Sequence, residues 1–244
     1  MNLLIDIGNT RNKFAISNHK NITDTVVRDT FSISVIKDIL KEHPDIDAAI
    51  LSAVKNTDRS VITYLKENLN YFIEFDEKTP IPIENLYQTK NTLGKDRLAA
   101  VIGAYNIYPN SNVLVIDMGT AITYDFINKG SQYLGGTISP GLEMRFKALN
   151  HFTDKLPLLE KNDSFQTIAK NTREAIVSGV QFGILFEIDG YINTLKTEYN
   201  DLKIFLTGGD AIFFDKKLKN TIFVNLNLNN IGLNTILEYN KPDE

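Results

Sequence analysis

The sequence predicts an α/β protein made of two tandem units that share one internal order, with a cleft between them. Residues 3–10 and 114–120 resemble each other, because each segment is an apolar strand that ends in Asp-x-Gly and reaches a threonine within two residues. Their aspartates, Asp6 and Asp117, lie 111 positions apart, which is close to half of the 244 residues. The segments that follow each copy also come in the same order. We therefore expect one structural unit to occur twice.

The first half opens with three strands and continues with alternating helices and strands. Polar residues separate the second strand from the third, and apolar residues four apart, such as Val61, Leu65 and Leu69, predict helices. In chain order we expect strands at 3–7, 13–17 and 23–29, a helix at 35–40, a strand at 48–54, a helix at 61–69, a strand at 71–75 and a helix at 95–108.

The second half repeats this order. We expect strands at 114–118, 121–127 and 132–138, a long helix at 172–198, a strand at 203–206, a short helix, a strand at 222–224 and a C-terminal helix. Three antiparallel strands followed by alternating helices and parallel strands are the pattern of a ribonuclease H-like unit. The boundary falls at residues 109–112, which predicts domains at 1–111 and 112–244. The alternative is that Asp-x-Gly turns recur by chance. The matching order of strands and helices after each turn favours a repeated unit over chance.

The composition excludes several classes of site and location. The chain has no cysteine, which rules out disulfide frameworks, thiolate zinc sites, iron–sulfur clusters and cysteine nucleophiles. Its apolar stretches are much shorter than the roughly 20 residues of a membrane span, and residues 1–9 lack the pattern of an export signal. A net charge of −4 without a basic run argues against a nucleic-acid surface. We expect a cytoplasmic protein with no membrane and no nucleic-acid partner.

The first Asp-x-Gly turn has the residue types of a phosphate-binding loop. Gly8 permits close approach of a ligand to backbone N–H groups, and Asn9 and Thr10 supply short donors. Lys13 adds a positive charge, whereas Asp6 would hold a hydrated metal because two anions in contact repel each other. A hairpin turn without a ligand is the alternative. Later in the chain, the Gly-Gly turn at residues 207–211 joins a strand to a helix and suggests a place for adenosine.

The two Asp-x-Gly turns and the Thr-Gly-Gly at 207–209 resemble the superfamily of actin, sugar kinases, acetate kinase and heat-shock chaperone ATPases, which contain two ribonuclease H-like domains. Within it, four stretches resemble the type III pantothenate kinases, and they span the chain in the family's order. They are residues 6–10, 93–97, 135–143, and 171–172 with 178–179. The resemblance implies ATP-dependent phosphorylation of pantothenate to 4′-phosphopantothenate, the first step of coenzyme A biosynthesis.

The resemblance also implies contacts to ATP and to metal ions. Mg²⁺ would accompany ATP, and Asp117 would bind a monovalent cation, K⁺ or NH₄⁺. The implied ATP contacts are Asp6, Ile7, Gly8, Asn9, Thr10, Arg11, Asn12 and Lys13 of the first loop, together with Thr120 of the second.

Asp96 would accept the proton of the substrate hydroxyl, and a surrounding set would bind pantothenate. By resemblance this set is Tyr87, Gly94, Lys95, Asp96, Arg97 and Thr172. The residues alone leave other roles open. Asp96 suits the first turn of a helix, Arg97 a surface ion pair, Tyr87 packing under the loop, and Thr172 an N-cap followed by Glu174. Thr89 and Lys90 stand where the family usually has Asn-Pro, so the conformation of this loop is open.

Type III enzymes are homodimers, and we expect the helix at 172–198 to contribute to the subunit interface. Its Gly179 and Gly183 are four residues apart, a spacing that allows close helix packing, either between subunits or within one. Two other functions remain open at this point. One is a ribonuclease H-like nuclease that uses Asp6 and neighbouring carboxylates as a two-metal site, and the other is a non-catalytic ATP-binding regulator of the same fold.

Overall fold

The structure is a computed structural model that describes residues 1–8, 12–19 and 21–242. The chain forms two compact units. The first comprises Met1–Asn110, Gly130–Leu134 and Asn227–Glu244, and the second comprises Ser111–Lys129 and Gly135–Leu226. The main division therefore falls beside the expected boundary at 111, but the C-terminal helix groups with the first unit and not, as expected, with residues 112–244.

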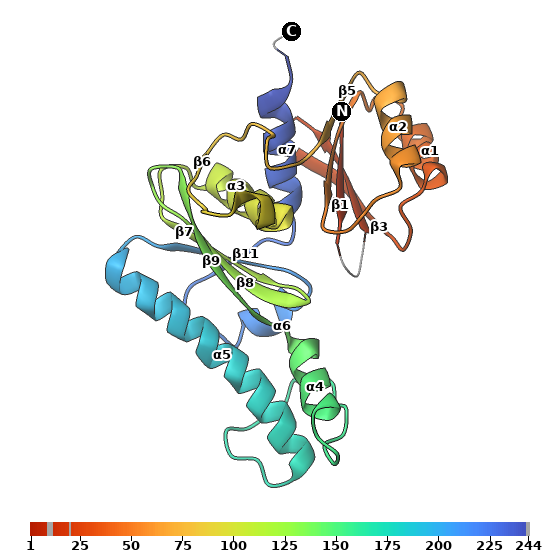
Figure 1. The fold of residues 1–244 in the computed structure, drawn as a ribbon. Helices are drawn as coiled ribbons and strands as arrows, with labels where there is room; N and C mark the ends of the chain where they lie inside the picture. Colours follow the sequence, from red (N-terminus) through yellow and green to blue (C-terminus); the bar gives the residue numbers. More distant parts are fainter. Residues whose placement is uncertain (9–11, 20, 243–244) are drawn as a thin grey trace. The chain divides into compact units, whose positions relative to one another are not determined.

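The first unit is built on a five-stranded sheet in the order β3-β2-β1-β4-β5. Strand β1 is antiparallel to β2 and parallel to β4, so its C-terminal end lies between a hairpin strand and a crossover strand. Helices α1 (Ile33–Glu42) and α2 (Arg59–Asn68) cover one face of this sheet, and α7 lies on the other (Figure 1). The strands are β1 (Asn2–Ile7), β2 (Asn12–Asn18), β3 (Asn21–Arg28), β4 (Ala48–Ala53) and β5 (Tyr71–Glu74).

The core of the first unit follows from the period-two alternation of its strands. Leu3, Ile5 and Ile7 of β1 are fully buried against apolar residues of α1 and α2. On the opposite face β1 carries polar residues. Asn2 donates to Asn234 of α7 at 2.8 Å, and Asp6 follows on the same face. One face of β1 therefore packs into the hydrophobic core, and the other is hydrogen-bonded to α7 through Asn2.

Helices α3 (Lys95–Ile107) and α7 (Leu228–Asn240) pack with their backbones in contact. A β-carbon on Gly103 would lie 2.1 Å from the carbonyl oxygen of Leu228, and one on Gly232 would lie 1.8 Å from that of Ala99. Because a β-carbon at either position would overlap backbone atoms of the other helix, this close packing requires glycine at both. This contact is the physical reason that α7 belongs to the first unit.

The second unit repeats the strand order of the first. Its sheet runs β11-β10-β7-β8-β9, in which β8 and β9 extend the antiparallel side and β10 and β11 the parallel side. The same order in both sheets confirms the expected fold of two ribonuclease H-like units. The strands are β7 (Val113–Met118), β8 (Ala121–Ile127), β9 (Gln132–Pro140), β10 (Lys203–Thr207) and β11 (Phe223–Val224). A short strand, β6 (Glu84–Asn85), pairs with Gln132 and Tyr133 at the start of β9.

Helix α5 (Thr172–Glu198) runs along one face of the second sheet (Figure 1). Its Ile184, Ile188 and Ile192 are fully buried in the core of this unit, which matches the expected long helix. The sequence analysis did not anticipate α4 (Leu142–His151), because only Leu142 and Phe146 of this helix are buried. Two buried residues give too weak a period for detection. The short helix α6 (Ala211–Asp215) follows the Gly-Gly turn.

Candidate functional site

Asp6 lies at the C-terminal end of β1, directly between two cross-strand neighbours. Lys13 of β2 and Ser52 of β4 are its partners in register, so their side chains share one face of the sheet. Asp6 is only 7% exposed. The strand pairing therefore places a buried carboxylate beside an ammonium group and a hydroxyl group.

Asn229 of α7 and Asp96 of α3 complete the surroundings of Asp6. The side-chain amide of Asn229 donates to Asp6 Oδ2 at 3.4 Å. Burial raises the pKa of Asp6 most strongly; the nearby Lys13 lowers it, the Asp96 carboxylate raises it, and the Asn229 hydrogen bond lowers it. The net effect is a raised pKa. The two carboxylates implied for ATP and for catalysis thus lie within electrostatic reach of each other.

Three buried oxygen atoms of the first unit have no hydrogen-bond partner among the described residues. They are Ser52 Oγ beside Asp6, Oδ1 of Asn229, and Oδ1 of Asn12, whose amide nitrogen donates to the Asp29 carbonyl at 2.9 Å. Buried polar atoms normally have partners, so the oxygens of Ser52 and Asn229, which adjoin Asp6, suit a ligand or its water molecules. With the Asp6 carboxylate they are oxygen donors of the kind that a hydrated Mg²⁺ prefers, whereas Asn12 pairs with Ile7 and lies on the opposite face of the sheet.

The structure describes only part of the first phosphate loop. Ile7 is buried in the core and its carbonyl accepts from the Val54 N–H at 3.0 Å, so its side chain positions the strand. Lys13 lies on β2 and is the cross-strand neighbour of Asp6. Asn9, Thr10 and Arg11 lie outside the described residues.

Except for Thr172, the residues implied to bind pantothenate lie at or near the start of α3. Asp96 Oδ1 accepts from the backbone N–H of Arg97 at 2.9 Å, and a β-carbon on Gly94 would lie 2.5 Å from the same oxygen. Arg97 is 7% exposed, and its guanidinium carbon lies 5.8 Å from the centre of the Tyr87 ring. A surface ion pair is therefore the wrong description of Arg97. Lys95 donates to the Leu93 carbonyl at 3.4 Å.

The loop before α3 forms a turn without the family's Asn-Pro. Residues Lys90–Thr92 make one 3₁₀ turn. The Thr92 hydroxyl donates to the carbonyl of Thr89 at 2.9 Å and lies at the same distance from the Thr89 hydroxyl. Two threonine side chains thus hold this turn locally.

In the second unit, Asp117 occupies the position that Asp6 holds in the first. It is the last but one residue of β7, with Thr123 of β8 and Thr207 of β10 as its cross-strand partners. Gly208 has φ of +93°, and a β-carbon there would lie 2.5 Å from Asp117 Oδ1. Backbone therefore wraps closely around this carboxylate, as at a site where an ion or a phosphate approaches the main chain.

The comparisons with known proteins give the family. A family model described as type III pantothenate kinase matches residues 2–194. The chain belongs to the type III pantothenate kinase family. Type III pantothenate kinases from Bacteroides fragilis and Phocaeicola vulgatus are 43% and 44% identical to it; the matches cover 98% of this chain in both cases, and 98% and 99% of the respective relatives.

Solved structures with lower sequence identity agree on the fold. A Campylobacter jejuni protein described as a Baf family transcriptional activator has a TM-score of 0.62 at 24% identity, with 98% of each chain covered. A 2-dehydro-3-deoxygalactonokinase family structure from Sinorhizobium meliloti has a TM-score of 0.60 at 10% identity, covering 99% of this chain and 100% of the other. Both likenesses concern the fold alone.

In this member of the type III pantothenate kinase family, Thr172 lies apart from the other residues expected to bind pantothenate. It is exposed, lies in the second unit, and is the first residue of α5. The expectation that Thr172 caps the helix was wrong. Asn171 has the extended backbone that a cap requires, with φ of −145°, and its side chain accepts from the Glu174 N–H at 3.0 Å. Thr120 is likewise exposed, at the β7–β8 turn.

Sequence reasoning missed two residues beside Asp6. Ser52 follows an apolar run and Asn229 lies in a helix that was expected in the other domain, so neither carried a motif. The register of β4 against β1 places Ser52 beside Asp6. The packing of α7 in the first unit brings Asn229 to the same carboxylate. A polar residue at the end of a buried parallel strand, as at Ser52, was the one signal available.

Proposed function

We propose that this protein transfers the γ-phosphoryl group of ATP to the hydroxyl group of pantothenate and so forms 4′-phosphopantothenate, the first step of coenzyme A synthesis. The supporting observation is the group of Asp6, Asp96 and buried Arg97 in one unit of a chain that aligns over its length with type III pantothenate kinases. No step requires a cysteine, which this chain lacks.

Asp96 is the proposed acceptor of the hydroxyl proton. Its Oδ1 is held by the Arg97 N–H, and Oδ2 is the oxygen we assign to the substrate. Phosphoryl transfer passes through a loose transition state in most analyses, so the hydroxyl needs mainly to be positioned and loses its proton late. A carboxylate in contact with the hydroxyl can therefore serve as the acceptor.

Arg97 and Tyr87 are the proposed anchors of pantothenate. The guanidinium group is largely buried against the Tyr87 ring, which in turn lies 6.1 Å from the ring of Tyr133. A forked donor with a fixed plane suits the carboxylate of pantothenate, because it can give two parallel hydrogen bonds. We also propose that Gly94, Lys95 and Thr172 contact the substrate, as the family resemblance implies.

Asp6 is the proposed holder of Mg²⁺, acting with the partnerless oxygens of Ser52 and Asn229. When bound, the ion neutralises charge on the β- and γ-phosphates of ATP. Lys13, opposite Asp6, adds a second positive charge. We assign Gly8 to the phosphate loop because a residue without a side chain lets phosphate oxygens approach the backbone. We assign Asn9, Thr10, Arg11 and Asn12 to the same ATP loop, and we propose Thr120 as a further ATP contact.

Asp117 is the proposed site of a monovalent cation. Its carboxylate lies close to the backbone of Gly208 and Gly119, where a β-carbon would come within 2.5 Å and 3.4 Å of Asp117 Oδ1. A carboxylate is a hard oxygen ligand of the type that such an ion takes. We expect activity in K⁺ or NH₄⁺ and a strong loss of rate in Na⁺ alone at equal ionic strength, measured by ADP release. Full activity in Na⁺ would contradict this role, and titration of K⁺ back into the same sample is the control.

ADP release with and without pantothenate tests the proposed function directly. We expect ADP to form only when ATP, Mg²⁺ and pantothenate are all present, with product mass matching the addition of one phosphoryl group. Binding of ATP without pantothenate-dependent release would instead support a regulator of this fold. Cleavage of an RNA–DNA hybrid in Mg²⁺ would support a nuclease.

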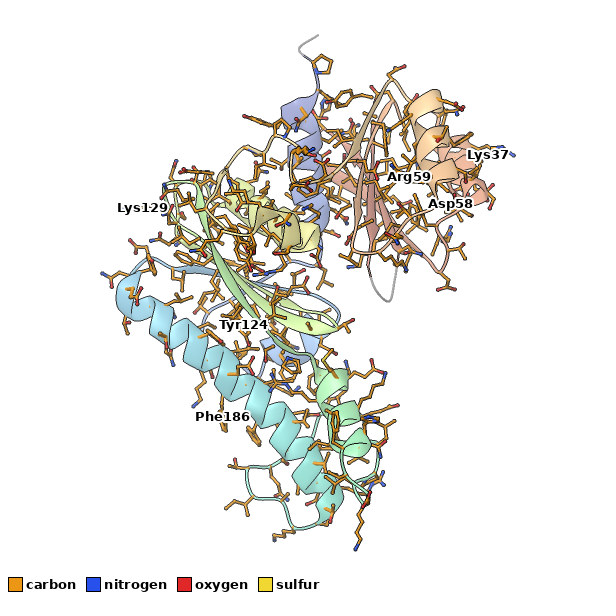
Figure 2. All side chains as sticks on the ribbon, viewed as in Figure 1. Lys37, Asp58, Arg59, Tyr124, Lys129 and Phe186 are labelled. Atoms are coloured by element: carbon orange, nitrogen blue, oxygen red, sulfur yellow. The ribbon has the colours of Figure 1, made fainter. Side chains whose placement is uncertain are left out.

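We further propose a homodimer that forms through α5. Phe186 is 62% exposed and stacks on Phe182, and a β-carbon on Gly179 or Gly190 would meet nothing within 4 Å. Figure 2 shows Phe186 on the side of α5 that faces away from Tyr124 and the sheet. By length and composition α5 could cross a membrane, but 44% of its most apolar window is buried in this unit. A single-chain mass in light scattering would contradict the dimer.

We infer a cytoplasmic location, because ATP and the proposed reaction belong to that compartment. Cell fractionation that placed the protein in the membrane would contradict this inference.

A further inference from the structure

Arg145 of α4 joins two other elements of the second unit through side-chain hydrogen bonds. Its Nη2 donates to Glu187 Oε2 of α5 at 2.5 Å and to the hydroxyl of Ser139 at 2.9 Å, and its Nε donates to the Pro140 carbonyl at 2.8 Å. The other carboxylate oxygen of Glu187 accepts from the Tyr124 hydroxyl of β8 at 2.8 Å. These contacts tie the last two residues of β9, and with them the turn at Gly141 that leads into α4, to both the sheet and the long helix.

The network of Arg145, Glu187 and Tyr124 is partly shielded from water, and it pairs a positive side chain with a negative one. The side chains of Arg145 and Glu187 are 19% and 23% exposed. Burial by itself raises the pKa of Glu187, but the hydrogen bonds from Arg145, Tyr124 and Ser139 lower it by more. The net pKa is therefore lowered, and Glu187 is held as a carboxylate. Burial and the Glu187 carboxylate raise the pKa of Tyr124, which keeps its hydroxyl as a donor. Charge-assisted bonds of this kind are the stronger ones in proteins.

The turn that Arg145 holds lies directly against the second phosphate loop. Gly141 donates its backbone N–H to the Thr120 carbonyl at 3.2 Å. A β-carbon on Gly141 would lie 2.3 Å from that oxygen and 2.6 Å from the Gly119 carbonyl oxygen. Because the two backbones are in contact, a displacement of the turn must also displace Gly119 and Thr120.

We infer that Arg145 is a positioning residue for the second phosphate loop, and that with Glu187 and Tyr124 it sets the affinity for ATP and not that for pantothenate. The inference rests on the proposed function, in which Thr120 contacts ATP. Apart from Thr172, the residues assigned to pantothenate lie in the first unit. The hydrogen bonds from Arg145 to Pro140, Ser139 and Glu187 involve none of the residues assigned to pantothenate.

The decisive experiment compares the two Michaelis constants of Arg145→Met, which keeps most of the side-chain length and removes the guanidinium group. We expect KM for ATP to rise about tenfold or more, with KM for pantothenate within about twofold of the wild type, and calorimetry should show ATP binding weakened by a similar factor. Glu187→Gln should give a smaller rise in KM for ATP. The double variant should fall short of the product of the two effects, because the residues form one network.

Lys147→Met is the matched control, since Lys147 lies on the same helix in an exposed ion pair with Glu143 at 2.7 Å. It should change neither constant. If Arg145→Met melts below the assay temperature, Arg145→Lys replaces it, because Lys retains the charge but cannot bond Pro140, Ser139 and Glu187 together. An unchanged KM for ATP, or an equal rise in both constants, would overturn the inference.

Direct ATP binding separates this inference from the proposed function. A wild-type protein that binds ATP but releases no ADP with pantothenate would refute the proposed function. In that case, weaker ATP binding by Arg145→Met would still support the positioning role of Arg145, and unchanged ATP binding would contradict it. A wild-type protein that does not bind ATP would refute both.

Discussion

Asp96→Asn is expected to lower kcat by about a thousandfold, while ATP and pantothenate still bind. Asn has nearly the same shape, and its side-chain oxygen still accepts from the Arg97 N–H, so the start of α3 stays intact. The variant cannot accept the hydroxyl proton, and general base catalysis contributes about 10² to 10⁴ in rate. ADP release measures kcat, and calorimetry measures both binding constants.

Asp38→Asn provides the control for Asp96, because Asp38 is an exposed carboxylate on α1. It should leave kcat and both Michaelis constants unchanged. Wild-type turnover in Asp96→Asn would show that another group accepts the proton. Loss of pantothenate binding along with turnover would instead assign Asp96 a binding role.

Asp6→Asn is expected to abolish Mg²⁺-dependent turnover and, in the absence of Mg²⁺ and ATP, to stabilise the fold near neutral pH. The pKa of Asp6 is raised by burial above its value in the unfolded chain. At pH values above the folded pKa, the protein must therefore carry a buried charge that the unfolded chain carries in water. Each unit of the shift lowers the free energy of unfolding by about 1.4 kcal/mol, and Asn removes this cost.

The pH dependence distinguishes this electrostatic cost from a packing effect. As pH falls through the folded pKa toward about 4, wild-type Asp6 takes up a proton in the folded state and the advantage of Asn should disappear. Denaturant unfolding at neutral pH and near pH 4 measures the difference. A wild type more stable than Asp6→Asn at neutral pH would contradict a raised pKa.

The fold was predictable because it depends on local patterns that occur twice. Alternating apolar residues gave the hairpin strands, and the order of elements gave two sheets with the same strand sequence, as observed. Helix α4 escaped detection because only two of its residues are buried. The place of α7 was missed because two glycines far apart in sequence, Gly103 and Gly232, determine it.

The candidate site was predictable where a motif carried it. Residues 93–97 and Asp117 could be named from sequence, and whether they bind the proposed ligands is a matter for the experiments above. Arg97 was open to a surface role because nothing local reveals that it packs on Tyr87. Asn229, Ser52 and Arg145 depend on register and on contacts between distant segments, which a single sequence does not encode in any short pattern.

The glycine contact between α3 and α7 has a consequence for the order in which the chain acquires structure during synthesis. The second unit comprises Ser111–Lys129 and Gly135–Leu226, so all of its residues have been synthesised before α7 leaves the ribosome. The first unit must wait, because the partner of α3 lies more than 120 positions downstream. At about 5–20 residues per second this interval is on the order of ten seconds, during which the buried face of α3 lacks its covering helix. The N-terminal unit is therefore the later one to be finished.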